Sequence, residues 1–354
     1  KSLWPLLSSG GGEGGEDSTL RYLVVVERLS SDYWSAHYRL LQVIEALRRA
    51  GRGVDLVVTE ECPTYNFLRR LLSLGVPCEC LSELTDKSVA HLLASEDKGE
   101  YAVALLFMWF FNNPNVPERV IPELKRLSPK TRAVVVTDDV HWLRMQGLSR
   151  ARGGLPEVAA IRILKEGRRL PTPAPVLTWQ QALTMSTETA DDSAIQVCKL
   201  REAVAYCWAD AVATISAEDA TLIRGMAPYQ AVSPIRMATM GVPKRDPLPF
   251  TDRFGIIFVG NGFNPTNHMS IEWFLAEVMP LVWADPRGED VRLTLVGQEP
   301  DRPDGWGATD DRVAETGRVR DLEPYLAVAR VFVSPIIAGT GLNVKQLLAL
   351  EHGL

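Results

Sequence analysis

The sequence of 354 residues has no long hydrophobic run and no excess of basic residues. Its longest apolar run, at 101–111, has eleven residues, whereas a membrane-spanning helix needs about 18. The 44 Asp and Glu residues outnumber the 38 Lys and Arg residues, which gives a net charge of −6. A broad nucleic-acid surface needs clustered positive charge. The sequence therefore predicts neither a transmembrane segment nor a nucleic-acid partner.

Cysteine is scarce, and its spacing matches no known framework. The five cysteines are Cys62, Cys78, Cys80, Cys198 and Cys207. They are odd in number and form no C-x-x-C pair or zinc-binding spacing. The single residue between Cys78 and Cys80 gives a poor geometry for metal or redox chemistry. We therefore predict five free thiols and no metal site, which favours an intracellular reducing compartment without fixing one.

Several motifs of well-known enzyme classes are also missing. No G-x-G-x-x-G follows the first predicted strand at 21–27, because the glycines at 10–15 come before it. The sequence contains no G-x-x-x-x-G-K-[ST], no H-E-x-x-H and no G-x-S-x-G. These absences disfavour dinucleotide-binding proteins, P-loop proteins, zinc proteases and α/β-hydrolases.

Short β-branched runs alternate with amphipathic helical periods along most of the chain. The run at 21–27 predicts a buried strand, and the stripe at 36–49 predicts a helix after it. Further strands are predicted at 54–59, 101–106, 133–137, 211–215, 255–259, 292–296 and 331–334. Further helices are predicted at 63–75, 117–127, 197–208, 270–283, 321–329 and from 343 onward. This alternation is typical of α/β proteins with parallel sheets covered on both faces.

Changes in composition divide the chain into segments. Residues 1–19 are rich in Gly, Ser and acidic residues and predict a flexible leader. Residues 147–192 interrupt the alternation and predict a long loop or lid. The three prolines at 241–252 predict a linker. It would join an N-terminal Rossmann-like domain at 20–240 to a second α/β domain at 253–354.

A glycine-rich turn near the end of the chain is a candidate anion site. The predicted strand at 331–334 leads into Gly339, Thr340 and Gly341, and the next helix has Lys345 in its first turn. Glycines let backbone N–H groups approach an anion, and a helix N-terminus favours negative charge. A lysine is slightly unfavourable at that end of a helix, so its presence suggests an anionic ligand. The alternative is a plain glycine turn with a solvated lysine.

Several strand-end segments together resemble a known family. GIIFVGNGFNPTN at 255–267, LTLVG at 293–297, GRVRDLEPY at 317–325 and VFVSPIIAGTGL at 331–342 occur in the family's order. They resemble the nucleotide-sugar half of glycosyltransferase family 4, the group 1 transferases of GT-B fold. VTDDVHWLR at 136–144 and ADAVATISAEDATL at 209–222 resemble segments of its first half. The resemblance implies two Rossmann-like parallel-sheet domains that face a central cleft.

The resemblance also implies an activity and a set of site residues. It implies a retaining hexosyl transfer from a nucleotide-diphosphate sugar to an unknown acceptor, without a metal or other cofactor. The donor would be bound by Gly260, Asn267, Gly317, Val319, Asp321, Gly339, Thr340, Gly341 and Lys345. Asp139 and His141 would be the catalytic residues on the acceptor side. A structural histidine bonded to a loop carbonyl, and an aspartate that caps a helix, are the alternatives at these two positions.

The sequence departs from the family pattern at two points. The family's two donor-site glutamates fall at Ala338 and Leu348, which cannot accept a hydrogen bond from a sugar. A non-catalytic GT-B module within a larger assembly is therefore the alternative function, and a sugar-nucleotide epimerase is a third. The sequence stops at Leu354, before the last elements of a GT-B fold. We therefore expect an incomplete C-terminal domain with apolar surface that further residues or a protein partner would cover.

Overall fold

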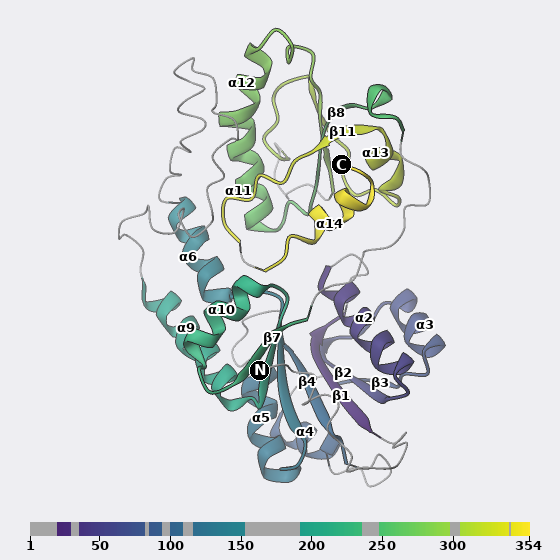
Figure 1. Cartoon of the computed structure of the whole chain (residues 1–354), viewed down its shortest axis with the longest axis vertical. Helices are drawn as coiled ribbons and strands as arrows, with labels where there is room; N and C mark the ends of the chain where they lie inside the picture. The colour runs from purple at the N-terminus through teal and green to yellow at the C-terminus, as the bar shows by residue number, and fades with distance from the viewer. Residues whose placement is uncertain are drawn as a thin grey trace. The chain divides into compact units, whose positions relative to one another are not determined.

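The computed structural model describes residues 20–29, 35–81, 85–93, 100–108, 116–152, 192–235, 248–297, 305–339 and 341–354. They belong to two compact α/β units, each built on one sheet (Figure 1). The strand pairs of both sheets are all parallel within the described residues. The predicted leader, most of the predicted linker and Thr340 lie outside the described residues.

The first unit contains a seven-stranded sheet with the order β3-β2-β1-β4-β5-β6-β7. Its strands are β1 (Arg21–Arg28), β2 (Gly53–Glu61), β3 (Cys78–Cys80), β4 (Val103–Met108), β5 (Arg132–Thr137), β6 (Ala211–Thr214) and β7 (Ala231–Pro234). Its helices are α2 (Ser35–Arg49), α3 (Tyr65–Ser73), α4 (Asp86–Leu93), α5 (Val116–Leu127), α9 (Asp192–Trp208) and α10 (Ala217–Met226), and α6 (His141–Arg152) begins in it.

The core of the first unit forms around β1, whose six central residues are buried. Alternate residues of β1 face opposite sides of the sheet, and one set packs on α2 and α3. That set and its partners are Tyr22, Val24, Val26, Leu40, Ile44, Phe67 and Leu71. Helices α4 and α5 cover the other side (Figure 1). The chain leaves β1 toward β3 and returns to β4 on the opposite flank of β1, so the strand order reverses between β1 and β4.

The second unit contains a four-stranded sheet with the order β10-β9-β8-β11. Its strands are β8 (Phe254–Val259), β9 (Leu293–Val296), β10 (Val313–Glu315) and β11 (Ala329–Phe332). Its helices are α11 (Pro265–Trp273), the π-helical turn η3 (Phe274–Val278), α12 (Met279–Ala284), α13 (Glu323–Val328) and α14 (Val344–Glu351), and a short 3₁₀ turn, η2 (Phe250–Asp252), precedes β8.

Two apolar clusters cover the two faces of the second sheet. Phe258 of β8 packs with Ile271 and Phe274, so α11 and η3 lie on one face. Ile257, the preceding residue of β8, packs with Leu326 of α13 and Leu348 of α14 on the other face. Figure 1 shows the two sets of helices on either side of this sheet. The helices that follow β8 and β11 therefore leave toward opposite faces, and the strand order reverses between these two strands.

Most predicted elements are present, with shifted ends, but one boundary is wrong. The loop predicted from residue 147 begins later, because α6 continues to Arg152. Gly147 lies inside this helix, which tolerates a single glycine at a cost of about 1 kcal/mol. Residues 153–191 of the predicted loop lie outside the described residues. The predicted helix at 270–283 begins earlier, at Pro265, and contains the π-helical turn. Strands β3, β7 and β10 and helices α4, α6 and α10 were not among the predicted elements.

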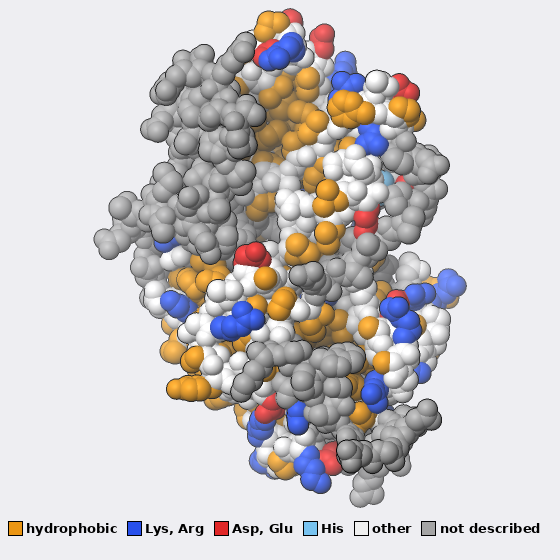
Figure 2. Space-filling view, in the orientation of Figure 1, with side chains coloured by type: hydrophobic (Ala, Val, Ile, Leu, Met, Phe, Trp, Pro, Cys, Tyr) orange, Lys and Arg blue, Asp and Glu red, His pale blue; other side chains and the backbone are white. Residues whose placement is uncertain are grey.

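The surface carries charges of both signs. On the face shown in Figure 2, basic and acidic side chains are interspersed, with hydrophobic side chains between them. On the second unit, Val331 of the edge strand β11 and Leu350 of α14 are 46% and 68% exposed. Among the described residues, no helix combines the length and apolar character needed to cross a bilayer.

Candidate functional site

Three glycines lie at the carboxyl ends of neighbouring strands in the second sheet. Gly260 follows β8, Gly297 follows β9, and Gly317 lies two residues after β10. The Gly297 N–H donates to the Gly317 carbonyl at 3.1 Å, and the Gly260 N–H donates to the Val296 carbonyl at 2.9 Å. Gly297 has a φ of +137°, and a Cβ there would lie 1.7 Å from the Gly260 carbonyl oxygen. The strand ends are therefore joined through backbone alone.

Lys345 and Asn267 meet where the strand order reverses. The Lys345 ammonium, on α14, donates to the Asn267 Oδ1 on α11 at 2.6 Å. It also lies 4.3 Å from the centre of the Phe258 ring on β8. The Asn267 Nδ2 donates to the Asn261 carbonyl at 2.9 Å, which orients the amide. Asn267 and Lys345 thus come together with Gly260, from which a Cβ would be 3.1 Å from the Asn267 amide nitrogen.

This position is chemically suited to an anion. In open α/β sheets, ligands bind beyond the carboxyl ends of the strands where the strand order reverses. The N-termini of α11 and α14 both lie there, and helix N-termini favour negative charge. Burial lowers the pKa of Lys345 to about 7, because a desolvated ammonium is costly. Asn267 is neutral, so a negatively charged partner would raise the pKa of Lys345 again and restore its charge.

The remaining predicted donor residues have varied surroundings. A Cβ on Gly339 would lie 3.8 Å from Thr266 Cγ2, so the loop after β11 runs beside the first turn of α11. Gly341 has a φ of +75°, a left-handed conformation that favours glycine. Val319 packs in the apolar cluster with Leu326. The Asp321 carboxylate accepts from the Glu323 N–H at the start of α13, so both of these side chains have structural contacts.

The two positions that depart from the family pattern are both withdrawn from solvent, fully at Ala338 and partly at Leu348. Ala338 is only 3% exposed. Leu348 packs in the cluster around Ile257, beneath the sheet. Neither position presents a hydrogen-bond acceptor near Lys345. The polar groups brought together here among the described residues are the Lys345 ammonium, the Asn267 amide and backbone groups.

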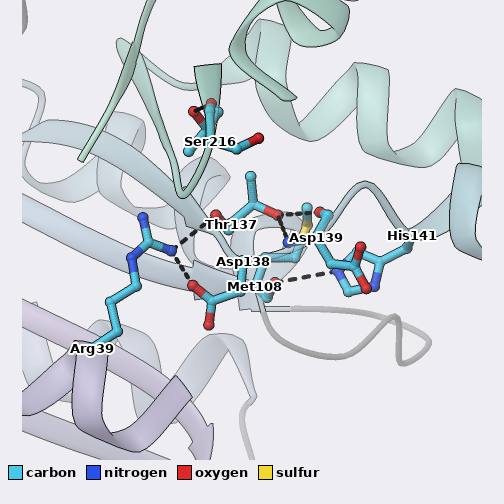
Figure 3. A network of polar contacts seen from close by, with 8 residues as sticks. Arg39, Met108, Thr137, Asp138, Asp139, His141 and Ser216 are labelled. Atoms are coloured by element: carbon cyan, nitrogen blue, oxygen red, sulfur yellow. Dashed lines mark hydrogen bonds and ion pairs between the residues drawn. The ribbon is translucent and has the colours of Figure 1, made fainter. Parts of the chain in front are cut away.

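The strand ends of the first unit carry a network of polar side chains instead (Figure 3). Arg39 of α2, which is 1% exposed, donates to the Thr137 carbonyl at 3.0 Å and pairs with the Asp138 carboxylate. The Thr137 hydroxyl donates to the Asp139 carbonyl at 2.5 Å. These contacts fix the turn after β5, from which Asp139 and His141 extend.

His141 is buried, and its Nε2 lies 3.3 Å from the Met108 carbonyl oxygen (Figure 3). This contact corresponds to a structural histidine bonded to a carbonyl. The helix that His141 begins is capped by Glu202, from α9. The Glu202 carboxylate accepts from the His141 and Trp142 N–H groups at 3.0 and 2.9 Å. Glu202 therefore supplies side-chain acceptors for the N–H groups at the start of this helix.

Glu202 is fully buried and also accepts from the Tyr206 hydroxyl at 3.0 Å. Burial raises the pKa of Glu202 to about 7, although its three donors oppose this shift. Sequence analysis missed both Glu202 and Arg39. For Glu202 the available signal was an acidic residue in the apolar part of a predicted helix. Arg39 gave a similar signal, because it adjoins the apolar residues Leu40 and Leu41.

Comparison with solved structures defines the class of fold. The crystal structure of Anabaena HepE in complex with UDP and glucose matches with a TM-score of 0.55 and 12% identity, covering 94% of this chain and 79% of HepE. A UDP-glucosyltransferase from Polygonum tinctorium matches with a TM-score of 0.48 and 14% identity, covering 89% of this chain and 74% of the other. The first likeness shows that the chain has the α/β GT-B fold.

Comparison of sequences identifies the second unit more closely. Residues 253–354 match the family model described as Glycosyl transferases group 1. This part of the chain, which holds Gly260, Asn267 and Lys345, is therefore similar to group 1 glycosyl transferases. No curated protein sequence matches the chain.

Proposed function

We propose that this protein is a glycosyltransferase that transfers a sugar from a nucleotide-diphosphate donor, with the diphosphate bound beside Lys345. The observation that carries the proposal is the contact between Lys345 and Asn267 at 2.6 Å. It lies at the reversal of strand order in the domain that matches group 1 glycosyl transferases. UDP is the first nucleotide to test, since it is bound in the structure of HepE.

The proposed donor site works through charge and backbone. A diphosphate oxygen would take the place of Asn267 Oδ1 as partner of the Lys345 ammonium. The loop through Gly339, Thr340 and Gly341 would supply N–H groups, and Gly317, Val319 and Asp321 would border the nucleoside. As the sugar leaves, negative charge develops on the diphosphate, and a fixed cation stabilises that charge. Lys345 supplies this cation, so the proposal includes no metal ion or other cofactor.

The proposal extends to the acceptor and to the stereochemistry. Asp139 would receive the acceptor, and His141 would hold the turn after β5 through its contact with Met108. By the family resemblance, the sugar would keep its anomeric configuration. Analysis of the product anomer by NMR tests this part. An inverted product would contradict it without affecting the donor site.

Titration calorimetry of the full chain with UDP, GDP and ADP tests the donor site. We expect one of them to bind. We expect Lys345→Ala to weaken that binding roughly 10- to 150-fold, because a charge-assisted contact contributes about 1.5–3 kcal/mol. The matched control is Gln346→Ala, which alters an exposed neighbour on α14. Equal affinities for the Lys345→Ala variant and the unaltered protein would contradict the assignment.

A non-catalytic GT-B module is the second candidate function. The observation in its favour is that two apolar residues, the buried Ala338 and the partly buried Leu348, stand where family 4 carries glutamates. In that case the exposed Val331 and Leu350 would face a protein partner. Release of free sugar from the bound nucleotide sugar, measured against a protein-free blank, separates the two candidates. Turnover above the blank excludes the non-catalytic module.

A further inference from the structure

Three of the five thiols gather at one edge of the first sheet. The edge strand β3 pairs with β2, with Leu56 opposite Cys78 and Val58 opposite Cys80. Cys78 and Cys80 are two residues apart, so their side chains share one face of the strand. Cys62 directly follows the last residue of β2. The ends of two neighbouring parallel strands therefore bring cysteines together that lie 18 residues apart in sequence.

The Cys80 thiol is the centre of this group. It is within hydrogen-bonding reach of the thiols of both Cys62 and Cys78. The end of β3 is fixed beside β2 by the Leu81 N–H, which donates to the Val58 carbonyl at 2.8 Å. Cys62 and Cys80 are exposed, whereas Cys78 is half-buried. A small reagent in solution can therefore reach the first two.

Geometry excludes one of the three possible cysteine pairs, and the side-chain contact of Cys80 with Cys62 favours that pair among the other two. Residues two apart on a strand have Cα atoms about 6.6 Å apart and nearly parallel Cα–Cβ bonds. A disulfide needs a Cβ–Cβ distance of about 3.5–4.5 Å, which excludes Cys78 with Cys80. Cys62 and Cys80 come from different strand ends and have no such restriction. A metal centre is disfavoured, because no group of His, Cys, Asp or Glu among the described residues is arranged to hold an ion.

We propose that Cys62 and Cys80 form a reversible disulfide when the protein meets a low-molecular-weight disulfide such as oxidised glutathione. The Cys62 thiolate attacks one sulfur of oxidised glutathione, which releases one reduced glutathione and leaves a mixed disulfide on Cys62. The Cys80 sulfur, after losing its proton to water, attacks the Cys62 sulfur and releases the second reduced glutathione. Two protein thiols are oxidised and one glutathione disulfide is reduced.

The order of the two steps follows from the surroundings of Cys80. Although Cys80 is exposed as a residue, local desolvation of its sulfur and, after that, the neighbouring thiols raise the pKa of Cys80 above the usual thiol range, so it carries its proton at neutral pH. The thiolate is the attacking species in disulfide exchange, so the exchange begins at Cys62. In the second step Cys80 is already held against its target, which compensates for its low acidity.

The cross-link would close a loop that contains the whole of α3. It would tie the end of β3, which pairs only with β2 among the described strands, to the end of β2. Closing a loop of this length constrains the unfolded chain. We expect the oxidised protein to melt about 5 °C higher than the reduced protein.

Mass spectrometry of the full chain after exposure to oxidised glutathione tests the proposal. Trypsin and a Glu-specific protease together separate Cys78 from Cys80, because Glu79 lies between them. We expect a peptide with Cys62 linked to Cys80, and a fall from five free thiols to three. The link should disappear in Cys62→Ser and in Cys80→Ser, and treatment with dithiothreitol should reverse it.

Two controls make the result decisive. Cys78→Ser and Cys207→Ser should both keep the link, since neither removes a member of the pair. The rise in melting temperature should follow the link in every variant. A link to Cys78 instead, or glutathione that stays on Cys62 with no internal bond, would overturn the proposal. Neither result bears on donor binding, which involves the other unit.

Discussion

The two units begin from the same strand order but end their strands differently. Each sheet has its first four strands in the order third, second, first, fourth. In the second unit, backbone of Gly260, Gly297 and Gly317 joins the strand ends. In the first unit, buried charged side chains from distant helices, Arg39 and Glu202, hold them. The strand ends of the second unit therefore depend on the absence of side chains, and those of the first unit depend on buried polar side chains.

The largest expected effect is at the glycines that join the strand ends of the second unit. Gly297→Ala would place a Cβ 1.7 Å from the Gly260 carbonyl oxygen at a φ of +137°. We expect the free energy of unfolding to fall by about 4 kcal/mol, since overpacking and backbone strain act together. Denaturant titration measures it. Gly307→Ala is the control, because Gly307 also has a positive φ but has open space around it. Similar losses in both variants would contradict the role of close approach.

The next effect concerns the buried carboxyl of the first unit. The pKa of Glu202 is about 7 in the folded protein and 4.5 in the unfolded chain. Between these values the unfolded chain has lost the proton and the folded protein keeps it, so stability falls as pH rises. Across this pH range the free energy of unfolding should fall by about 3 kcal/mol. Denaturant titration from pH 4.5 to 7.5 should show this slope in the unaltered protein and a shallower one in Glu202→Gln. The same pH dependence in both proteins would contradict the assignment of this slope to Glu202.

A smaller effect links pH to the proposed donor site. Burial lowers the pKa of Lys345 to about 7, and a bound diphosphate would raise it again. Above pH 7, UDP binding should therefore take up a proton and weaken by up to about tenfold per pH unit. Calorimetry at pH 7, 8 and 9 in two buffers measures both quantities. Lys345→Arg should remove the slope, because a guanidinium stays charged; a slope that persists would show that another group titrates.

The smallest effect is expected for an exposed charge pair. Arg126 pairs with Glu123 on α5 at 2.6 Å, and its side chain is 61% exposed. Arg126→Ala should change the free energy of unfolding by less than about 0.5 kcal/mol, because water screens such pairs. A loss as large as that of Glu202→Ala, measured in the same titration, would mean that burial does not distinguish the two kinds of contact.

The glycines at the strand ends of the second unit could be located from the sequence. The buried polar contacts at the strand ends of the first unit could not. Gly260, Gly297 and Gly317 all lie in the strand-end segments that carry the family resemblance, so the resemblance marks their positions. Glu202 caps α6 across 61 residues, and Arg39 reaches Asp138 across 99. Local patterns do not contain such contacts, which arise only when parallel strand ends are brought to one edge. Cys62 and Cys80 escaped prediction for the same reason.

The glycines at the strand ends of the second unit also limit how nucleotide specificity could be altered in the proposed donor site. A surface made of main chain presents the same N–H and C=O groups whatever residues flank it. Gly297 has no room for even a methyl group, so mutation cannot add a selective contact there. In the proposed donor site, a change in nucleotide preference would therefore come from surrounding positions that already carry a side chain, such as Asn267 and Val319.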